Sequence, residues 1–194
     1  MFDGYQYDVF LSYRRHKLTT HWIEGFQDRL TYWLTQELGG RDARVFFDID
    51  SIEVGDHWPN ALREALKTSR CMVGLWSSDY FRSRWCMSEW RSFLEREKQA
   101  GLQSGGLVAP IKCHDGEYFP IEARSIQQFD LSQYWYTVSN FWETLRAVEA
   151  DESLKKFAKH LAIIVHRAPS FNPNWRVIEA SPEQFPACVP LQRL

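Results

Sequence analysis

The sequence predicts an α/β domain in which helices cover both faces of a parallel sheet. Short β-rich runs alternate along the chain with segments of helical periodicity, and residues 71–76 and 107–111 are apolar on both alternating faces. Strands of that kind are typical of a sheet that is buried on both sides. Alternating strands and helices with short connections indicate parallel strands. The 194 residues suffice for one domain of ordinary size and leave little room for a second.

The first helix has the clearest pattern of the elements. Apolar residues recur every four positions from residue 22, Thr19 or Thr20 can cap its start, and Gly39 and Gly40 can end it. Its apolar face consists of Trp22, Phe26, Leu30, Leu34 and Leu38. We expect strands at 7–13, 44–47, 71–76 and 107–111, and a short edge strand at 126–131. Polar loops are expected at 48–59 and 77–84. Further helices are expected at 60–68, 85–98 and 140–166, the last with a candidate break near residue 151.

Composition excludes several classes of function. The formal net charge is −2 and no Lys/Arg-rich run occurs, which disfavours direct binding of nucleic acid. The four cysteines have no zinc-ligand spacing, so we expect no metal site and a reduced, cytoplasmic protein. No signal peptide begins the chain and no apolar run approaches the ~20 residues of a membrane span. We therefore expect a soluble protein without a membrane partner.

Familiar nucleotide and hydrolase motifs are also missing from the sequence. No G-x-G-x-x-G follows the first strand, and neither a Walker loop nor a G-x-S-x-G elbow occurs. A bound redox dinucleotide, phosphoryl transfer and serine-type hydrolysis are therefore disfavoured.

Residues 83–90, S-R-W-C-M-S-E-W, are more informative. Trp85, Glu89 and Phe93 share one stripe of the expected helix. Open parallel sheets bind ligands beyond the carboxyl ends of their strands, which points to the segments after residues 13, 47 and 76 and to the start of this helix. By residue type alone, however, a glutamate here is more often a solvated surface group.

Four segments in order resemble the boxes of the TIR (Toll/interleukin-1 receptor) domain family. Residues 7–15, Y-D-V-F-L-S-Y-R-R, resemble the first box, and residues 45–58 resemble the second with its BB loop. S-x-W-C-x-x-E at 83–89 is similar to the signature of NAD-consuming members, and Phe141-Trp142 matches the third box. The resemblance covers about residues 5–166, and the form of the BB loop resembles bacterial members more than animal adaptors.

This resemblance implies a flavodoxin-like, doubly wound parallel sheet of about five strands with helices on both faces. It implies a TIR domain at residues 1–167 and leaves a Pro-rich tail at 168–194. The tail is either a linker, for instance to a sensor, or a strap that packs through its aromatic residues, Phe171, Trp175 and Phe185.

The resemblance also implies one of two activities, cleavage of NAD+ or homotypic assembly with other TIR domains. Glu89 at the signature position favours NAD+ as a substrate, with no separate cofactor. In NAD+ the nicotinamide ring is a cationic pyridinium, which becomes neutral when it leaves the ribose, so no general acid is needed. One carboxylate can then stabilise the oxocarbenium-like ribose that remains. The expected product is ADP-ribose or a cyclic isomer, made by a defence effector or signal-producing domain that self-assembly activates.

The resemblance also implies further site residues, at the positions of this sequence that match the family's motifs. Expected substrate contacts are Tyr13, Arg14, Arg15, Asp48, Trp58, Ser77, Asp79 and Trp85. Five of them have a structural alternative: Arg15 could be a solvated loop residue, Asp48 a loop anchor, Ser77 and Asp79 turn caps, and Trp58 a packing residue. Ile52, Val54 and Gly55 of the BB loop are the expected assembly contacts, or the two apolar ones tuck under the loop.

Three alternative functions remain. A TIR scaffold would recruit partners through the BB loop without turning over NAD+. A nucleoside deoxyribosyltransferase also uses a glutamate at a ribose, but it would act on deoxynucleosides. A phosphoacceptor receiver domain is disfavoured, because no lysine on a late strand pairs with an acidic cluster in the order of that family.

Overall fold

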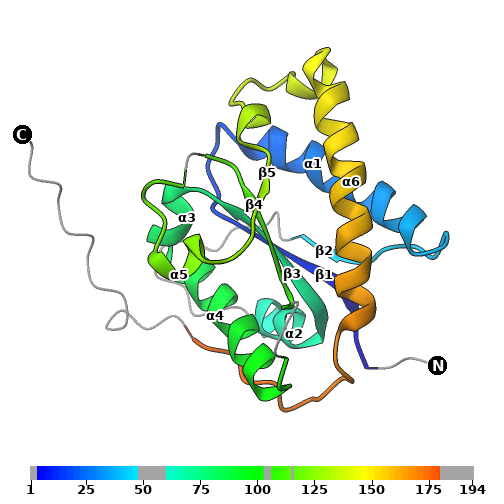
Figure 1. Cartoon of the computed structure of the whole chain (residues 1–194), viewed down its shortest axis with the longest axis vertical. Coiled ribbons are helices and arrows are strands. Elements are labelled where there is room, and N and C mark those ends of the chain that lie inside the picture. Colours follow the sequence, from blue (N-terminus) through cyan, green and yellow to red (C-terminus); the bar gives the residue numbers. More distant parts are fainter. Residues whose placement is uncertain (1–3, 48–59, 103–105, 115, 180–194) are drawn as a thin grey trace, which may run out of the picture.

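One parallel sheet forms the centre of the computed structural model, which describes residues 4–47, 60–102, 106–114 and 116–179. Within those ranges five strands lie in the order β2-β1-β3-β4-β5 (Figure 1). Their bounds are β1 Tyr7–Tyr13, β2 Val45–Phe46, β3 Ser69–Trp76, β4 Val108–Lys112 and β5 Phe129–Asp130. All neighbouring pairs are parallel, so the predicted α/β, doubly wound fold class is confirmed.

Helices cover both faces of this sheet. From β1 the chain moves to β2 at one side of the sheet, and then through β3, β4 and β5 towards the other side. Because the crossovers between parallel strands are right-handed, this reversal places α1 on one face of the sheet and α2 and α4 on the other. The helices are α1 Thr20–Glu37, α2 Asn60–Thr68, α3 Ser78–Arg82, α4 Arg84–Gln99, α5 Ile121–Arg124 and α6 Arg146–Arg167, with 3-10 turns η1 Ser132–Tyr134 and η2 Phe141–Glu143. Within the described ranges none of them is long and apolar enough to cross a membrane.

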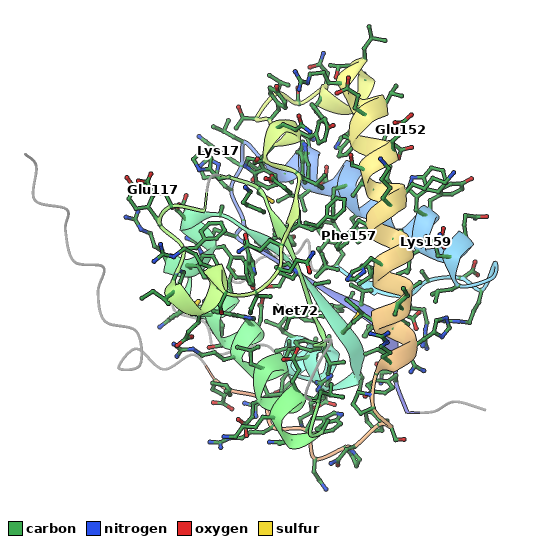
Figure 2. The ribbon with its side chains drawn as sticks, viewed as in Figure 1. Lys17, Met72, Glu117, Glu152, Phe157 and Lys159 are labelled. Carbon is green, nitrogen blue, oxygen red and sulfur yellow. The ribbon has the colours of Figure 1, made fainter. Side chains whose placement is uncertain are left out.

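The long helix α6 packs beside α1 over the same face (Figure 1). Figure 2 shows Phe157 on the side of α6 that faces the sheet, where it is buried, and Glu152 and Lys159 away from it, where both are exposed. The indole Nε1 of Trp33 in α1 donates to the carboxylate of Asp151 in α6 at 2.9 Å. Asp151 therefore joins two helices, and the candidate break near this residue is wrong.

The first helix follows its sequence pattern closely. Four of its five predicted apolar positions are fully buried, and Leu38 is partly buried. Gly39 and Gly40 end it with φ of 75° and 80°, a conformation that glycine adopts at little cost. The predicted side-chain cap is wrong, because the Thr19 hydroxyl donates to the carbonyl of His16 instead of accepting from the first turn.

Two other boundaries differ from the sequence-based expectation. The expected polar loop at 77–84 contains α3, because the Ser77 hydroxyl caps the backbone N–H of Tyr80 and the Tyr80 ring is fully buried. The last helix starts at Arg146 rather than at residue 140, since Phe141 turns into the core in a 3-10 turn.

The described part of the Pro-rich tail packs against the domain. The ring of Phe171 meets Tyr5 edge-on at 5.3 Å between centroids, and Trp175 is buried. Beyond it, the backbone N–H of Ile178 donates to Ser92 Oγ of α4 at 2.9 Å. Residues 168–179 therefore contact the domain, while Phe185 lies outside the described residues and the choice between linker and strap stays a prediction.

Candidate functional site

Glu89 lies in the second turn of α4, at the carboxyl ends of β1 and β3. The helix starts at this place because the Ser83 hydroxyl accepts from the backbone N–H of Cys86 at 3.4 Å. The glutamate is only 7% exposed. The expectation drawn from residue type alone, a solvated surface glutamate, is therefore wrong. The reason is that this part of α4 lies over the end of β1, where Cys86 Sγ also contacts the carbonyl of Tyr13 at 3.5 Å.

A buried hydroxyl from the sheet holds the glutamate. Ser12 Oγ donates to Glu89 Oε2 at 2.6 Å and lies 2.8 Å from the Tyr80 hydroxyl. Ser12 has one hydroxyl hydrogen, so when that hydrogen serves the carboxylate, Tyr80 is the donor towards Ser12. The Tyr80 hydroxyl also lies 3.2 Å from the carbonyl of Cys86, which competes for its hydrogen. Three elements, β1, α3 and α4, thus meet in one buried hydrogen-bond chain.

The phenol and the thiol near Glu89 stay protonated. Burial, with the charge of Glu89 adding to it, raises the pKa of Tyr80 well above its ordinary value. Burial likewise raises the pKa of the Cys86 thiol, and the charge of Glu89 raises it further. A neutral, buried thiol is a poor nucleophile. Cys86 is therefore a packing residue, and the carboxylate is the chemically competent group.

A pocket of about 120 Å³ opens beside the glutamate. Its size is of the order of the ~150 Å³ cavity that accepts a benzene ring in an engineered protein. Aromatic and aliphatic side chains form one wall, and Glu89, Arg14 and Arg15 contribute charge. The apolar lining consists of Phe10, Leu11, Phe46, Leu62 and Trp85. Since β1 is the strand at which the sheet order reverses, the pocket occupies the switch point where open α/β sheets bind ligands.

A second and larger cavity adjoins this pocket, and we call it the basic groove. It has a volume of about 560 Å³, and its charged lining residues are Arg14, Arg15, Asp79, Arg82 and Arg84. Arg14, Arg15, Ser83 and Trp85 line both cavities, so the two lie side by side.

The structure brings together most of the described residues that the sequence singles out. Tyr13, Arg14, Arg15, Trp85 and Glu89 line the pocket. Asp79 is exposed in the basic groove, and Ser77 takes the capping role that was its structural alternative. Asp48, Ile52, Val54, Gly55 and Trp58 lie outside the described residues, so their roles stay predictions.

Sequence reasoning missed Ser12 and Tyr80, although a signal for Ser12 was present. In the strand at 7–13, alternate residues face the same side, which places Ser12 with Phe10. The Phe10 ring packs against Phe93 of α4 at 6.3 Å, so a hydroxyl on this face had to find a buried partner. Tyr80 carried no such signal, because its segment read as a polar loop.

The described residues offer no obvious place for a metal ion. No cluster of three or more His, Cys, Asp or Glu side chains with the spacing of a metal site occurs in residues 4–47, 60–102, 106–114 and 116–179. The cysteines at 71, 86 and 113 are buried and unbonded to one another.

Comparison with known proteins decides the family. The family model described as "TIR domain" matches residues 9–146, which is most of the chain. The chain belongs to the TIR domain family. The resemblance seen in the four sequence boxes is thereby confirmed, and the boxes at 83–89 and at Phe141-Trp142 fall inside the matched range.

Curated relatives of this TIR domain include plant resistance proteins. It is 35% identical over 108 residues to disease resistance protein RUN1 and 34% identical over 112 residues to disease resistance protein RPV1, both of Vitis rotundifolia. Each of these two matches covers 56% of this chain. It is 30% identical over 91 residues, or 47% of the chain, to TMV resistance protein N of Nicotiana glutinosa. The match spans only 7% of the length of each relative. The particular likeness to bacterial members stays a prediction.

A solved structure with a similar chain is that of the TIR domains in the activated Roq1 resistosome, which directly recognises the pathogen effector XopQ. The likeness covers 84% of this chain and 85% of that one, at 22% sequence identity and a TM-score of 0.40.

Proposed function

We propose that this TIR domain is an NAD+ nucleosidase that breaks the nicotinamide–ribose bond, with Glu89 as its catalytic residue. The observation that supports this best is the environment of the carboxylate. Glu89 is nearly buried, Ser12 binds one of its oxygens at 2.6 Å, and a ring-sized pocket opens beside it. A carboxylate fixed in this way stabilises positive charge without having to reorganise when the charge develops.

The proposed reaction needs few groups from the protein. The C–N bond between ribose and the cationic nicotinamide breaks, its electron pair leaves with the ring, and nicotinamide departs neutral without protonation. Positive charge then develops on the ribose, where the Glu89 carboxylate stabilises it. Capture by water gives ADP-ribose and releases a proton, whereas capture by a group of the same molecule gives a cyclic isomer.

The biological setting that we propose is immune signalling. The named relatives are resistance proteins. We propose that self-assembly through the BB loop activates the domain, as the family resemblance implies. The alternative function is a TIR scaffold that assembles in the same way and does not consume NAD+.

Release of nicotinamide from NAD+, followed by chromatography over a wide range of protein concentration, tests the proposal. Glu89→Gln keeps the shape and an oxygen that accepts from Ser12, but it removes the charge. We expect it to lower the rate by about 10²–10³, the usual effect of removing one preorganised electrostatic group. Glu95→Gln is the matched control, because Glu95 lies on the same helix and contacts Gln99 at the surface.

Each outcome has a clear meaning when circular dichroism shows that both variants fold. A rate that rises faster than linearly with protein concentration supports activation by assembly. Full activity in Glu89→Gln, or an equal loss in Glu95→Gln, would remove Glu89 from the chemistry. Absence of turnover at every concentration, with self-association intact, would favour the scaffold.

A further inference from the structure

We propose that the basic groove binds the diphosphate of a dinucleotide, and that Arg82 and Arg84 make the site selective for phosphorylated substrates over plain nucleosides. The inference rests on the proposed function for the identity of the ligand. Neither arginine stood out in the sequence.

The groove concentrates positive charge in a chain that is acidic overall. Four arginines from three segments line it against a single aspartate, although the chain carries a formal net charge of −2. Arg14 and Arg15 follow β1, Arg82 ends α3, and Arg84 begins α4. The planar guanidinium group donates paired hydrogen bonds that match phosphate oxygens, so an arginine cluster in a hollow favours a phosphate ligand.

The two new arginines are arranged so that a phosphate can engage them at low cost. Arg82 lies 4.0 Å from the carboxylate of Asp79, and both side chains are more than half exposed. A contact of that length at the surface contributes little free energy, so a phosphate can replace it. The guanidinium of Arg84 lies over the Trp85 ring, 5.2 Å from its centroid. This cation–π contact holds Arg84 against Trp85, which lines both cavities.

The start of α4 adds a favourable field at the junction of the two cavities. Ser83, the N-cap residue of this 16-residue helix, lines both of them. The positive end of the helix dipole and the N–H groups of the first turn favour an anion at such a place.

The order of the two cavities follows the order of groups in the substrate. In NAD+ the ribose that carries nicotinamide is esterified at its 5′ oxygen with the diphosphate. When its glycosidic carbon lies at Glu89, the diphosphate lies a few bonds away. The walls shared through Arg14, Arg15 and Trp85 lead from the pocket into the basic groove. A nucleoside such as nicotinamide riboside would fill the pocket and leave the groove without a ligand.

Substrate preference is the first test. Steady-state rates are measured with NAD+ and with nicotinamide riboside for Arg82→Gln, Arg84→Gln and the double variant. Each single change should lower the preference for NAD+ by about 3- to 10-fold and the double change by roughly 10- to 100-fold, as expected when one and two charge-assisted contacts are lost. The loss should lie mainly in KM, because a contact made equally in the ground and transition states does not change kcat.

Arg167→Gln is the matched control, since Arg167 is an exposed arginine at the end of α6 that lines neither cavity. High salt should reduce the preference of the wild-type protein in the same direction, because it screens the charges of the guanidinium groups in the basic groove. An unchanged preference in the double variant would overturn the proposal.

Calorimetric binding of ADP-ribose separates failure of the groove from failure of the chemistry. ADP-ribose has the same diphosphate but no nicotinamide bond to break. Weaker binding of ADP-ribose to the double variant than to the wild type and Arg167→Gln supports the groove even if NAD+ is not cleaved. Equal binding to all three overturns the groove even if Glu89 proves catalytic.

Discussion

At the scale of single residues, the site depends on one hydroxyl. The distance of 2.6 Å from Ser12 Oγ to Glu89 Oε2 is short for a hydrogen bond, as expected when the acceptor carries a charge. Ser12 and Tyr80 do not line the pocket, so neither is placed to touch a substrate there. Their role is to fix the rotamer of the carboxylate, and we regard them as positioning residues.

We expect Ser12→Ala to lower kcat for NAD+ cleavage by about 10-fold, the value of one hydrogen bond to a charged group. KM should change little, because the lost contact orients the catalytic group rather than the bound substrate. Tyr80→Phe should have a smaller effect in the same direction, since it removes the donor to Ser12 but leaves the Ser12–Glu89 bond. Steady-state kinetics with each variant measure both quantities.

Ser12→Thr is the informative control, because it restores the hydroxyl at the same Cβ. Recovery of kcat in Ser12→Thr shows that the hydroxyl acts through the carboxylate. A rise in KM alone in Ser12→Ala, or equal activity in all variants, would contradict the positioning role. Thermal unfolding of each variant shows whether a loss of rate merely reflects a loss of folded protein.

The family boxes in the sequence predict some of this site and not the rest. Glu89 and the arginines after β1 were found because they lie in segments that resemble the boxes of the TIR family. The burial of Glu89 could not be predicted in the same way, since it depends on how α4 crosses the end of β1. Arg82 was missed for a related reason: its segment was taken as a loop, and only the folded α3 places it beside Arg84 and Asp79.

At the scale of elements, α1 and the turn η2 share a contact that leaves no room for a side chain. A Cβ atom at Gly25 would lie 2.2 Å from Cδ1 of the Trp142 ring. This ring is held from two sides, because its Nε1 donates to the carbonyl of Trp22 at 2.9 Å and the guanidinium of Arg29 lies 4.3 Å from its centroid. The Phe141-Trp142 box is therefore a clamp that fixes the segment before α6 onto α1.

Gly25→Ala is expected to destabilise the domain, by about 1–3 kcal/mol, the usual cost of overpacking. Alanine gains up to ~1 kcal/mol over glycine inside a helix, but the fixed indole ring must move by more than an ångström, so the clash outweighs the gain. Urea unfolding measures the free energy. In the double variant Gly25→Ala/Trp142→Leu the clash is relieved. Adding Trp142→Leu to Gly25→Ala should therefore lower the free energy of unfolding by less than Trp142→Leu does in the wild type. Additive costs in this cycle, or a more stable Gly25→Ala, would contradict the clamp.

The helices illustrate where periodicity in a sequence suffices. The pattern from Trp22 to Leu34 predicted α1 because every fourth residue of this stretch is buried, so tertiary packing agrees with local periodicity. At residues 140–145 the two disagree: a long helical pattern continued through Phe141, but that ring turns inward over Trp22, at 6.4 Å between centroids, and a 3-10 turn replaces the helix. No local signal distinguishes these two cases.

At the scale of the whole molecule, the two edges of the sheet are built for different purposes. The carboxyl edge carries the pocket and the basic groove, while the amino edge is closed by a fully buried carboxylate. Asp8 accepts from Arg41 at 3.0 Å through each of its oxygens and from the backbone N–H of Arg44 at 2.9 Å. Arg70 Nε lies 3.5 Å away. These contacts join β1, the segment before β2 and the start of β3.

The charge of Asp8 should make stability dependent on pH in the acid range. Burial acts to raise the pKa of this carboxyl, but the hydrogen bonds and charge of Arg41 and Arg44 outweigh it and hold the pKa below its ordinary value. The folded state therefore binds the proton less readily than the unfolded chain does. The stabilisation is present in full above the unfolded pKa of about 3.9 and is lost as the pH falls through the folded pKa.

Comparison of Asp8→Asn with the wild type tests this assignment. At pH 7 the substitution should lower the free energy of unfolding by about 2 kcal/mol, since an amide N–H₂ would face the guanidinium of Arg41 and the ionic contacts would be lost. Urea unfolding at intervals from pH 7 to pH 2 should show this difference narrowing below about pH 4, because the wild-type carboxyl then becomes neutral as well. Asp79→Asn, a change at an exposed carboxylate on the opposite edge, is the control and should show a much smaller difference throughout. A difference that stays constant down to pH 2 would mean that the shape of the Asp8 side chain, and not its charge, closes the amino edge of the sheet.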